Sequence, residues 1–177
     1  SADGGYPATC RHKDISLDAD NVSWRLSTTP GEKLIMKTWP GGNITAALPP
    51  SMNGFVVRKK DGFPAYQLTS VLDDLHFGVD FIVRGEDLWP STIAQLHLAR
   101  ALRREAFTNI TFCHHPLLLE TADRKLSKSA GSTSIQFLRK EGKRPADIYT
   151  MIAAMLGVSE PVRNFEELAA ATGWHAL

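Results

Sequence analysis

The sequence has little of what secreted and membrane proteins require. It contains two cysteines, Cys10 and Cys113, which argues against a disulfide-stabilised scaffold. No stretch approaches the roughly 20 consecutive apolar residues of a membrane span, and residues 1–14 hold no signal-peptide core. The net charge is +1, so no global basic field attracts nucleic acid, and any RNA contact must be a local patch. These absences predict a cytoplasmic protein with no membrane partner.

The composition is that of a folded protein with a sizeable core. Apolar residues make up 43% of the 177 residues and charged residues 22%, close to globular averages. This length suits one domain of ordinary size, or one and a half small ones.

Hydrophobic patterning predicts an α/β fold. Alternating or continuous apolar residues predict strands at 21–27, 33–39, 55–57, 79–83 and 110–113. Helical spacing predicts helices at 65–75, 91–103, 134–140, 145–156 and 165–171. The second helix is expected to be amphipathic and capped by Ser91 or Thr92, and Gly157 and Gly173 are candidate C-caps. The helix–strand order over residues 65–113 implies parallel, right-handed βαβ units, followed by an all-helical region after residue 131.

The segment that carries most chemical information is residues 123–131, with the sequence DRKLSKSAG. Lys125 and Lys128 lie three residues apart among hydroxyl-bearing residues, and the loop ends on small residues. Ammonium groups neutralise phosphate oxygens, while serine and backbone N–H groups donate hydrogen bonds to them. A solvated basic loop is the simpler interpretation of two spaced lysines alone. The five residues KLSKS, however, closely resemble the KMSKS loop of class I aminoacyl-tRNA synthetases.

Three further segments carry the same resemblance. They are DGFPAYQLTSVLDD at 61–74, VDFIVRGEDLWPSTIAQLHLARAL at 79–102 and HHPLLLE at 114–120. In this order they resemble the second half of the glutamyl-tRNA synthetase catalytic domain, over residues 54–156. The resemblance implies the second half of a Rossmann-like parallel sheet, with an inserted small β-containing segment and a C-terminal helical segment. It assigns residues 1–53 to an inserted zinc-binding, acceptor-side subdomain, 54–131 to the half-sheet and 132–177 to the helical segment.

The resemblance implies that Tyr66, Ser70 and Arg84 bind glutamate. The planar guanidinium of Arg84 suits a bidentate carboxylate, and it follows an apolar strand, where open α/β sheets bind ligands. The competing interpretation of Arg84 is a surface ion pair with Glu86 or Asp87. Tyr66 could equally be a buried aromatic at a helix start, and Ser70, one turn later, an incidental polar residue.

The resemblance also implies an ATP site that works with Mg²⁺. The residues expected to contact ATP are His114, Leu117, Leu118, Lys125, Ser127, Lys128 and Ser129. Lys125 and Lys128 are expected to be catalytic, because their charges stabilise the transferred phosphoryl group.

A shorter motif lies near the N-terminus. The spacing Tyr6-x-x-x-Cys10-Arg11 resembles half of the structural zinc site in glutamyl-queuosine tRNA(Asp) synthetases. Structural zinc takes four ligands, and this chain supplies two of them, so we expect zinc to bind poorly here.

The sequence lacks one motif that class I synthetases need, His-x-Gly-His. We therefore expect the chain to be part of a longer protein and to be inactive alone. The longer protein would activate glutamate with ATP and transfer it to tRNA, to the queuosine base of tRNA(Asp). The alternatives are a fragment of a discriminating glutamyl-tRNA synthetase, or a non-catalytic truncated paralogue that binds tRNA or nucleotide. A half-sheet would expose apolar surface, which predicts dimerisation of the fragment.

Overall fold

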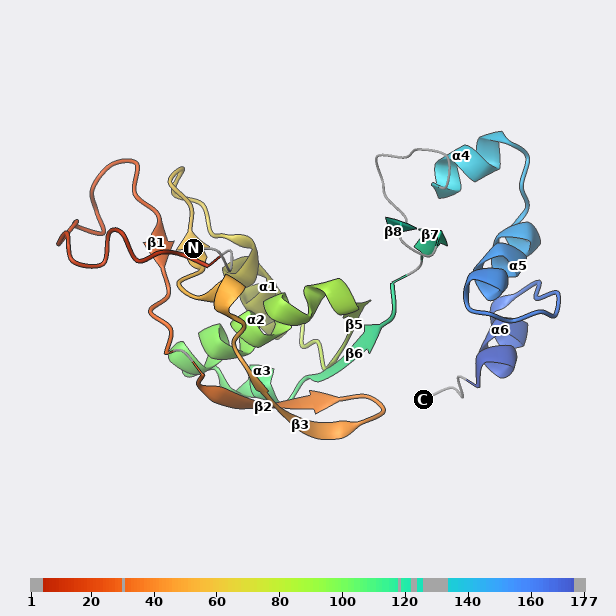
Figure 1. Cartoon of the computed structure of the whole chain (residues 1–177), viewed down its shortest axis with the longest axis horizontal. Coiled ribbons are helices and arrows are strands. Elements are labelled where there is room, and N and C mark those ends of the chain that lie inside the picture. Colours follow the sequence, from red (N-terminus) through yellow and green to blue (C-terminus); the bar gives the residue numbers. More distant parts are fainter. Residues whose placement is uncertain (1–4, 30, 118, 122–123, 126–133, 174–177) are drawn as a thin grey trace. The chain divides into compact units, whose positions relative to one another are not determined.

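The computed structural model describes residues 5–29, 31–117, 119–121, 124–125 and 134–173. The chain divides into two compact units, Ser1–Pro116 and Leu117–Leu177 (Figure 1). No helix among the described residues combines the length and the apolar character that crossing a lipid bilayer requires. The finer division at residues 53 and 131 stays a prediction.

A four-stranded sheet organises the first unit. Its strands are β2 (Lys33–Thr38), β3 (Gly42–Ala47), β5 (Phe81–Gly85) and β6 (Thr111–His115), in the order β3-β2-β6-β5. The strands β5 and β6 run parallel, with Arg84 in register with His114, and β2 is also parallel to β6. The α/β class and the parallel pairing of the two strands around the central helix are confirmed.

The edge strand β3 is an element that the sequence patterning did not predict. It pairs antiparallel with β2, with Met36 opposite Ile44, and it begins at Gly42 with φ +72°. Its sequence GNITAA carries only weak strand propensity. The strand forms because the alternation of β2 places Leu34 and Met36 in the core, and Ile44 and Ala46 extend that buried face.

Three helices cover one face of this sheet (Figure 1). They are α1 (Tyr66–His76), α2 (Trp89–Ala101) and the short α3 (Glu105–Thr108). The predicted cap of α2 is wrong: the N-cap is Leu88, with no side-chain cap, and Ser91 and Thr92 lie inside the first turn. Pro90 explains the earlier start, because its fixed φ and missing N–H suit a first helical turn.

The predicted helix is confirmed as α2, but its expected amphipathic character is wrong, because its central residues are buried on all sides. Every residue from 92 to 99 is buried, including the polar residues Thr92, Gln95 and His97. The sheet packs against one side of α2 and the helices α1 and α3 pack against the others. The fully buried core around it contains Met36, Val71, Ile93, Phe107 and Phe112.

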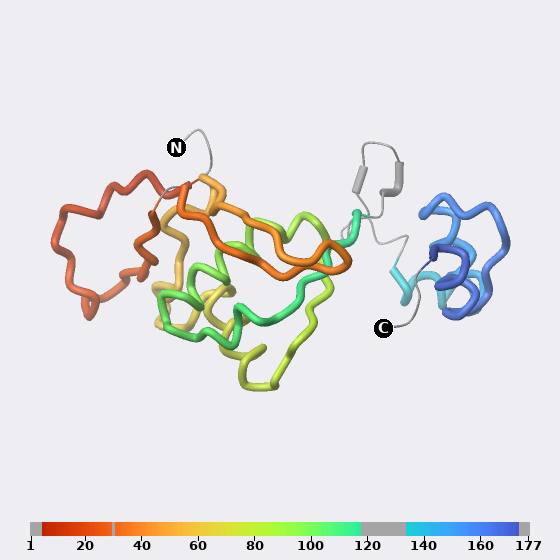
Figure 2. Tube along the Cα trace, turned by 90° about the horizontal axis from the view of Figure 1, so that it is seen from below, coloured from red at the N-terminus to blue at the C-terminus, as the bar shows by residue number. Residues whose placement is uncertain are grey.

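The N-terminal part of the first unit is mostly irregular, as predicted. Residues 5–23 form an extended loop before the short strand β1 (Trp24–Arg25) (Figure 2). This strand pairs antiparallel with β4 (Val56–Arg58), and a one-turn 3₁₀ helix (Pro50–Met52) precedes β4. A second 3₁₀ turn (Glu86–Leu88) joins β5 to α2.

The second unit is mainly helical, as predicted. It contains the antiparallel strand pair β7 (Leu119–Thr121) and β8 (Arg124–Lys125), then the helices α4 (Ile135–Lys140), α5 (Pro145–Met155) and α6 (Phe165–Thr172). Asn164 caps α6 by accepting from the backbone N–H of Glu167 at 2.8 Å, and Gly173 ends the helix with φ +71°. The predicted C-cap role of Gly173 is confirmed.

Candidate functional site

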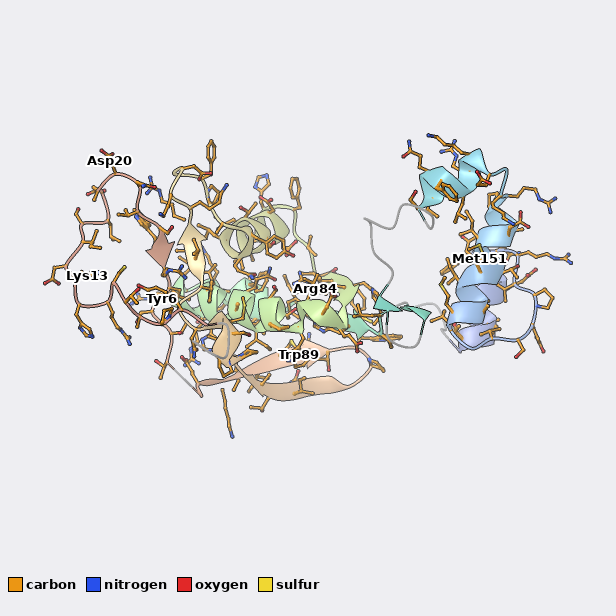
Figure 3. The ribbon with its side chains drawn as sticks, turned by 45° about the horizontal axis from the view of Figure 1, so that its top comes forward. Tyr6, Lys13, Asp20, Arg84, Trp89 and Met151 are labelled. Atoms are coloured by element: carbon orange, nitrogen blue, oxygen red, sulfur yellow. The ribbon has the colours of Figure 1, made fainter. Side chains whose placement is uncertain are left out.

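Arg84 lies at the carboxyl end of strand β5, beside the start of helix α2. Its neighbour in register on β6 is His114, and Trp89 begins α2 at the same end of the unit (Figure 3). The ring centroids of Trp89 and His114 are 5.0 Å apart. This arrangement confirms the expectation that Arg84 follows a parallel strand at the sheet edge where such folds bind ligands.

One nitrogen of the Arg84 guanidinium is held on the side of α2. Its Nη1 donates to Gln95 Oε1 at 2.8 Å and to Thr92 Oγ1 at 3.3 Å. The guanidinium carbon also lies 5.7 Å from the centre of the Phe112 ring. Among the described residues, the hydrogen bonds of Arg84 go to Gln95 and Thr92, and the alternative of a surface ion pair with Glu86 or Asp87 stays a prediction. Its Nη2 and Nε make no hydrogen bond to any described residue, so these two nitrogens can act together as a bidentate donor.

The electrostatics around Arg84 strengthen an interaction with an anion. Burial lowers the pKa of the Arg84 guanidinium from its usual range, and nearby Tyr66 and Asp74 oppose that change. Burial likewise raises the pKa of the Asp74 carboxyl, against the opposing effect of Arg84. Asp74 Oδ2 is buried without a hydrogen-bond partner among the described residues. A half-buried cation in a partly dry site attracts a carboxylate more strongly than an exposed one.

His114 is tied to the same cluster through Thr92. Its Nε2 lies 2.9 Å from Thr92 Oγ1, the hydroxyl that also accepts from Arg84. Burial, together with the charges of Arg84 and His115, lowers the pKa of His114 and so favours the neutral ring. The expected contact of His114 with ATP stays a prediction.

Tyr66 is the first residue of helix α1, and its side chain is 55% exposed. The alternative that Tyr66 is a buried aromatic at a helix start is therefore wrong. Ser70 lies one helical turn later and is half-buried. Tyr66 raises the pKa of Arg84, against the larger effect of burial.

The sequence analysis missed two residues of this cluster, Thr92 and Gln95. Thr92 and Gln95 are polar residues one turn apart in a helix whose other buried positions are largely apolar. A buried glutamine needs hydrogen-bond partners, so Gln95 in this largely apolar helix was a sequence signal for a polar contact with a neighbouring element.

The N-terminal motif lies at the opposite end of the first unit from Arg84 (Figure 3). The backbone N–H of Cys10 donates to Tyr6 Oη at 2.8 Å, and the Arg25 guanidinium lies 4.2 Å from the centre of the Tyr6 ring. A separate interaction, a side-chain hydrogen bond between the Cys10 thiol and Tyr6, is the largest cause of the lowered pKa of Cys10. The two predicted zinc ligands are thus close together.

The residues present do not fit a structural zinc site. No group of three or more histidine, cysteine or acidic side chains comes together in the part of the chain that the structure describes. A closed structural site needs four ligands. The zinc site of the longer protein stays a prediction.

Four of the seven residues predicted to contact ATP fall outside the described part of the chain. These are Leu118, Ser127, Lys128 and Ser129. Lys125 ends strand β8, and Leu117 begins the second unit.

Comparison with known proteins identifies the family. Residues 29–174 match the family "tRNA synthetases class I (E and Q), catalytic domain". The chain belongs to this family. It is 34% identical over 171 residues to a Glutamyl-Q tRNA(Asp) synthetase of Nocardia farcinica, which covers 94% of this chain and 52% of that protein. A protein of the same name from Deinococcus radiodurans is 32% identical over 152 residues, 85% of this chain and 50% of that protein.

This class I synthetase chain spans about half the length of the curated relatives that it matches. A solved glutamate tRNA ligase from Elizabethkingia meningosepticum superposes with a TM-score of 0.60 at 21% identity. That match covers 84% of this chain and 32% of the ligase. The likeness confirms the class I synthetase fold.

Proposed function

We propose that the protein containing this chain activates glutamate with ATP and transfers the glutamyl group to tRNA. In the first step, a glutamate carboxylate oxygen attacks the α-phosphorus of ATP, which yields glutamyl-adenylate and releases pyrophosphate. In the second step, the queuosine base of tRNA(Asp) accepts the glutamyl group and releases AMP. Family membership and the names of the relatives support this proposal.

The observation that carries the proposal is the free donor pair of Arg84. Nη1 is held by Gln95 and Thr92, and Nη2 and Nε make no hydrogen bond to a described residue. A carboxylate can accept both donors in parallel, which fixes the orientation of an amino acid as well as its position. Tyr66, which is exposed and contributes to the electrostatics of Arg84, would contact the same substrate. This positioning lowers the entropic cost of bringing the reacting carboxylate to ATP.

The phosphate chemistry belongs to the KLSKS segment in this proposal. Lys125 and Lys128, with Mg²⁺, would neutralise the charge that develops on the transferred phosphoryl group and on pyrophosphate. Ser127 and Ser129 would donate hydrogen bonds to phosphate oxygens. His114, Leu117 and Leu118 would contact the nucleotide. These roles rest on the resemblance of the segment to the KMSKS loop.

The test is glutamate-dependent pyrophosphate exchange by the protein at its natural length, measured with and without tRNA. Exchange without tRNA is the expected result. Exchange only in the presence of tRNA would instead support a discriminating glutamyl-tRNA synthetase. Salt-sensitive RNA binding without exchange would support a non-catalytic paralogue.

The acceptor is tested separately by transfer of labelled glutamate. We expect transfer to tRNA(Asp) that contains queuosine, and none to the same tRNA with unmodified guanine at that position. Equal labelling of both tRNAs would contradict the queuosine assignment.

A further inference from the structure

Gln95 is a polar residue in the most buried part of helix α2. Its side chain is completely buried, and its Oε1 accepts the 2.8 Å hydrogen bond from Arg84 Nη1. Its Nε2 is also buried and has no hydrogen-bond partner among the described residues. One half of the amide is therefore engaged with Arg84, and the other half is unsatisfied.

Packing of α2 alone does not explain a glutamine at this position. A buried amide donor without a partner destabilises the fold, whereas an apolar side chain of equal length has no such cost. The neighbours Ile93, Leu96 and Ala99 are apolar and fully or almost fully buried. The contact that distinguishes Gln95 from them is the one with Arg84.

Gln95 is the stronger of the two groups that hold Arg84. Thr92 Oγ1 lies farther from Nη1, at 3.3 Å, and is shared with the carbonyl of Leu88 and the ring of His114. Arginine has a long, flexible side chain, so two donors stay in a fixed direction only if another part of the guanidinium is anchored.

We propose that Gln95 is a positioning residue that anchors Nη1 of Arg84, so that Nη2 and Nε present a preorganised pair of donors to the carboxylate of the amino-acid substrate. The inference rests on the proposed function, because it assigns Arg84 to amino-acid binding. It adds a residue whose effect passes through Arg84 and does not require contact with the substrate.

The test is Gln95→Met in the protein at its natural length. Methionine has a similar length and an apolar, adaptable side chain, so the helix is expected to stay packed. We expect the KM for glutamate to rise about tenfold, equivalent to about 1.4 kcal/mol. The KM for ATP should stay unchanged and kcat should change by less than about threefold. The melting temperature should stay equal or increase, because the unsatisfied amide is removed.

Gln67→Met is the matched control. Gln67 is also a buried helical glutamine, with Oε1 unsatisfied among the described residues, and its Nε2 donates to Ser91 Oγ at 3.1 Å. It forms no hydrogen bond with Arg84. We expect the KM for glutamate to stay within about twofold of the original value in this variant. Equal increases in both variants would show a general packing effect and overturn the inference.

A second readout separates this inference from the proposed function. In ¹⁵N spectra of the unsubstituted protein, the anchored Arg84 should give distinct, slowly exchanging Nη1 and Nη2 signals, and Gln95→Met should average them. Averaged signals in the unsubstituted protein would overturn the inference, whether or not the protein activates glutamate. If Arg84→Lys raises the KM for glutamate and Gln95→Met does not, the proposed function stands and the anchoring role is wrong.

Discussion

Replacing Arg84 with lysine tests the substrate site most directly. Lysine retains the positive charge but has a single nitrogen in place of the planar guanidinium. In the structure, Nη1 is already used by Gln95 and Thr92, and the substrate is expected to take Nη2 and Nε. One ammonium cannot bind Gln95 and both oxygens of a carboxylate with the same geometry.

The magnitude follows from the number of hydrogen bonds lost. Arg84→Lys removes at least one hydrogen bond between a charged donor and a charged acceptor, which contributes about 1.5–3 kcal/mol. We therefore expect kcat/KM for glutamate to fall roughly 10- to 150-fold. The KM for ATP should change by less than about threefold, since Arg84 is assigned to the amino acid.

Pyrophosphate exchange at varied glutamate and ATP concentrations measures both quantities. Arg100→Lys is the control on helix α2, which also carries Gln95 and Thr92, because Arg100 is 63% exposed and its Nη1 lies 3.1 Å from Glu32 Oε1. An exposed ion pair contributes only about 0–1 kcal/mol to stability, and Arg100 has no assigned substrate contact, so kcat/KM should be unaffected. If Arg84→Lys retains kcat/KM for glutamate within about threefold, the carboxylate does not bind Arg84 and the reasoning is refuted.

Four further predictions follow from other parts of the chain. Burial lowers the pKa of His97, against the effect of Glu32, so the protein should lose stability as pH falls below the ordinary histidine pKa of 6.5. His97→Leu should reduce this dependence of the melting temperature on pH, and an unchanged dependence would contradict the prediction. Lys128→Ala should reduce pyrophosphate exchange at least about 100-fold while calorimetric glutamate binding is retained; equal losses in both contradict a transition-state role. Val83 is 55% exposed on the edge strand β5, so the 177-residue chain should dimerise in sedimentation equilibrium, and Val83→Lys should abolish the dimer. A monomer at every concentration would argue against this prediction. The 177-residue chain alone should catalyse no glutamate-dependent exchange because it lacks His-x-Gly-His, and detectable exchange would contradict this expectation.

Most of the regular elements could be predicted because their signals are local. The helices at Tyr66–His76, Pro145–Met155 and Phe165–Thr172 lie within about one residue of their predicted bounds. The parallel pairing of β5 and β6 also followed from the order of elements along the chain.

Two of the errors share a physical cause, since each concerns an element whose surroundings come from distant parts of the chain. Strand β3 has weak propensity of its own and forms by pairing with β2. Helix α2 shows a polar residue at nearly every turn, yet the sheet and the helices α1 and α3 bury every residue from 92 to 99. Local periodicity does not report how many neighbours surround a helix.

The sequence by itself determined the family, the α/β class and the position of Arg84 at the end of a parallel strand. These conclusions depend on short motifs and on periodicity, which are properties of neighbouring residues. Only the tertiary structure decided what Arg84 touches: Gln95 and Thr92 hold its Nη1 from α2. Hydrogen bonds between side chains on different elements depend on how those elements pack, and no local pattern encodes that geometry.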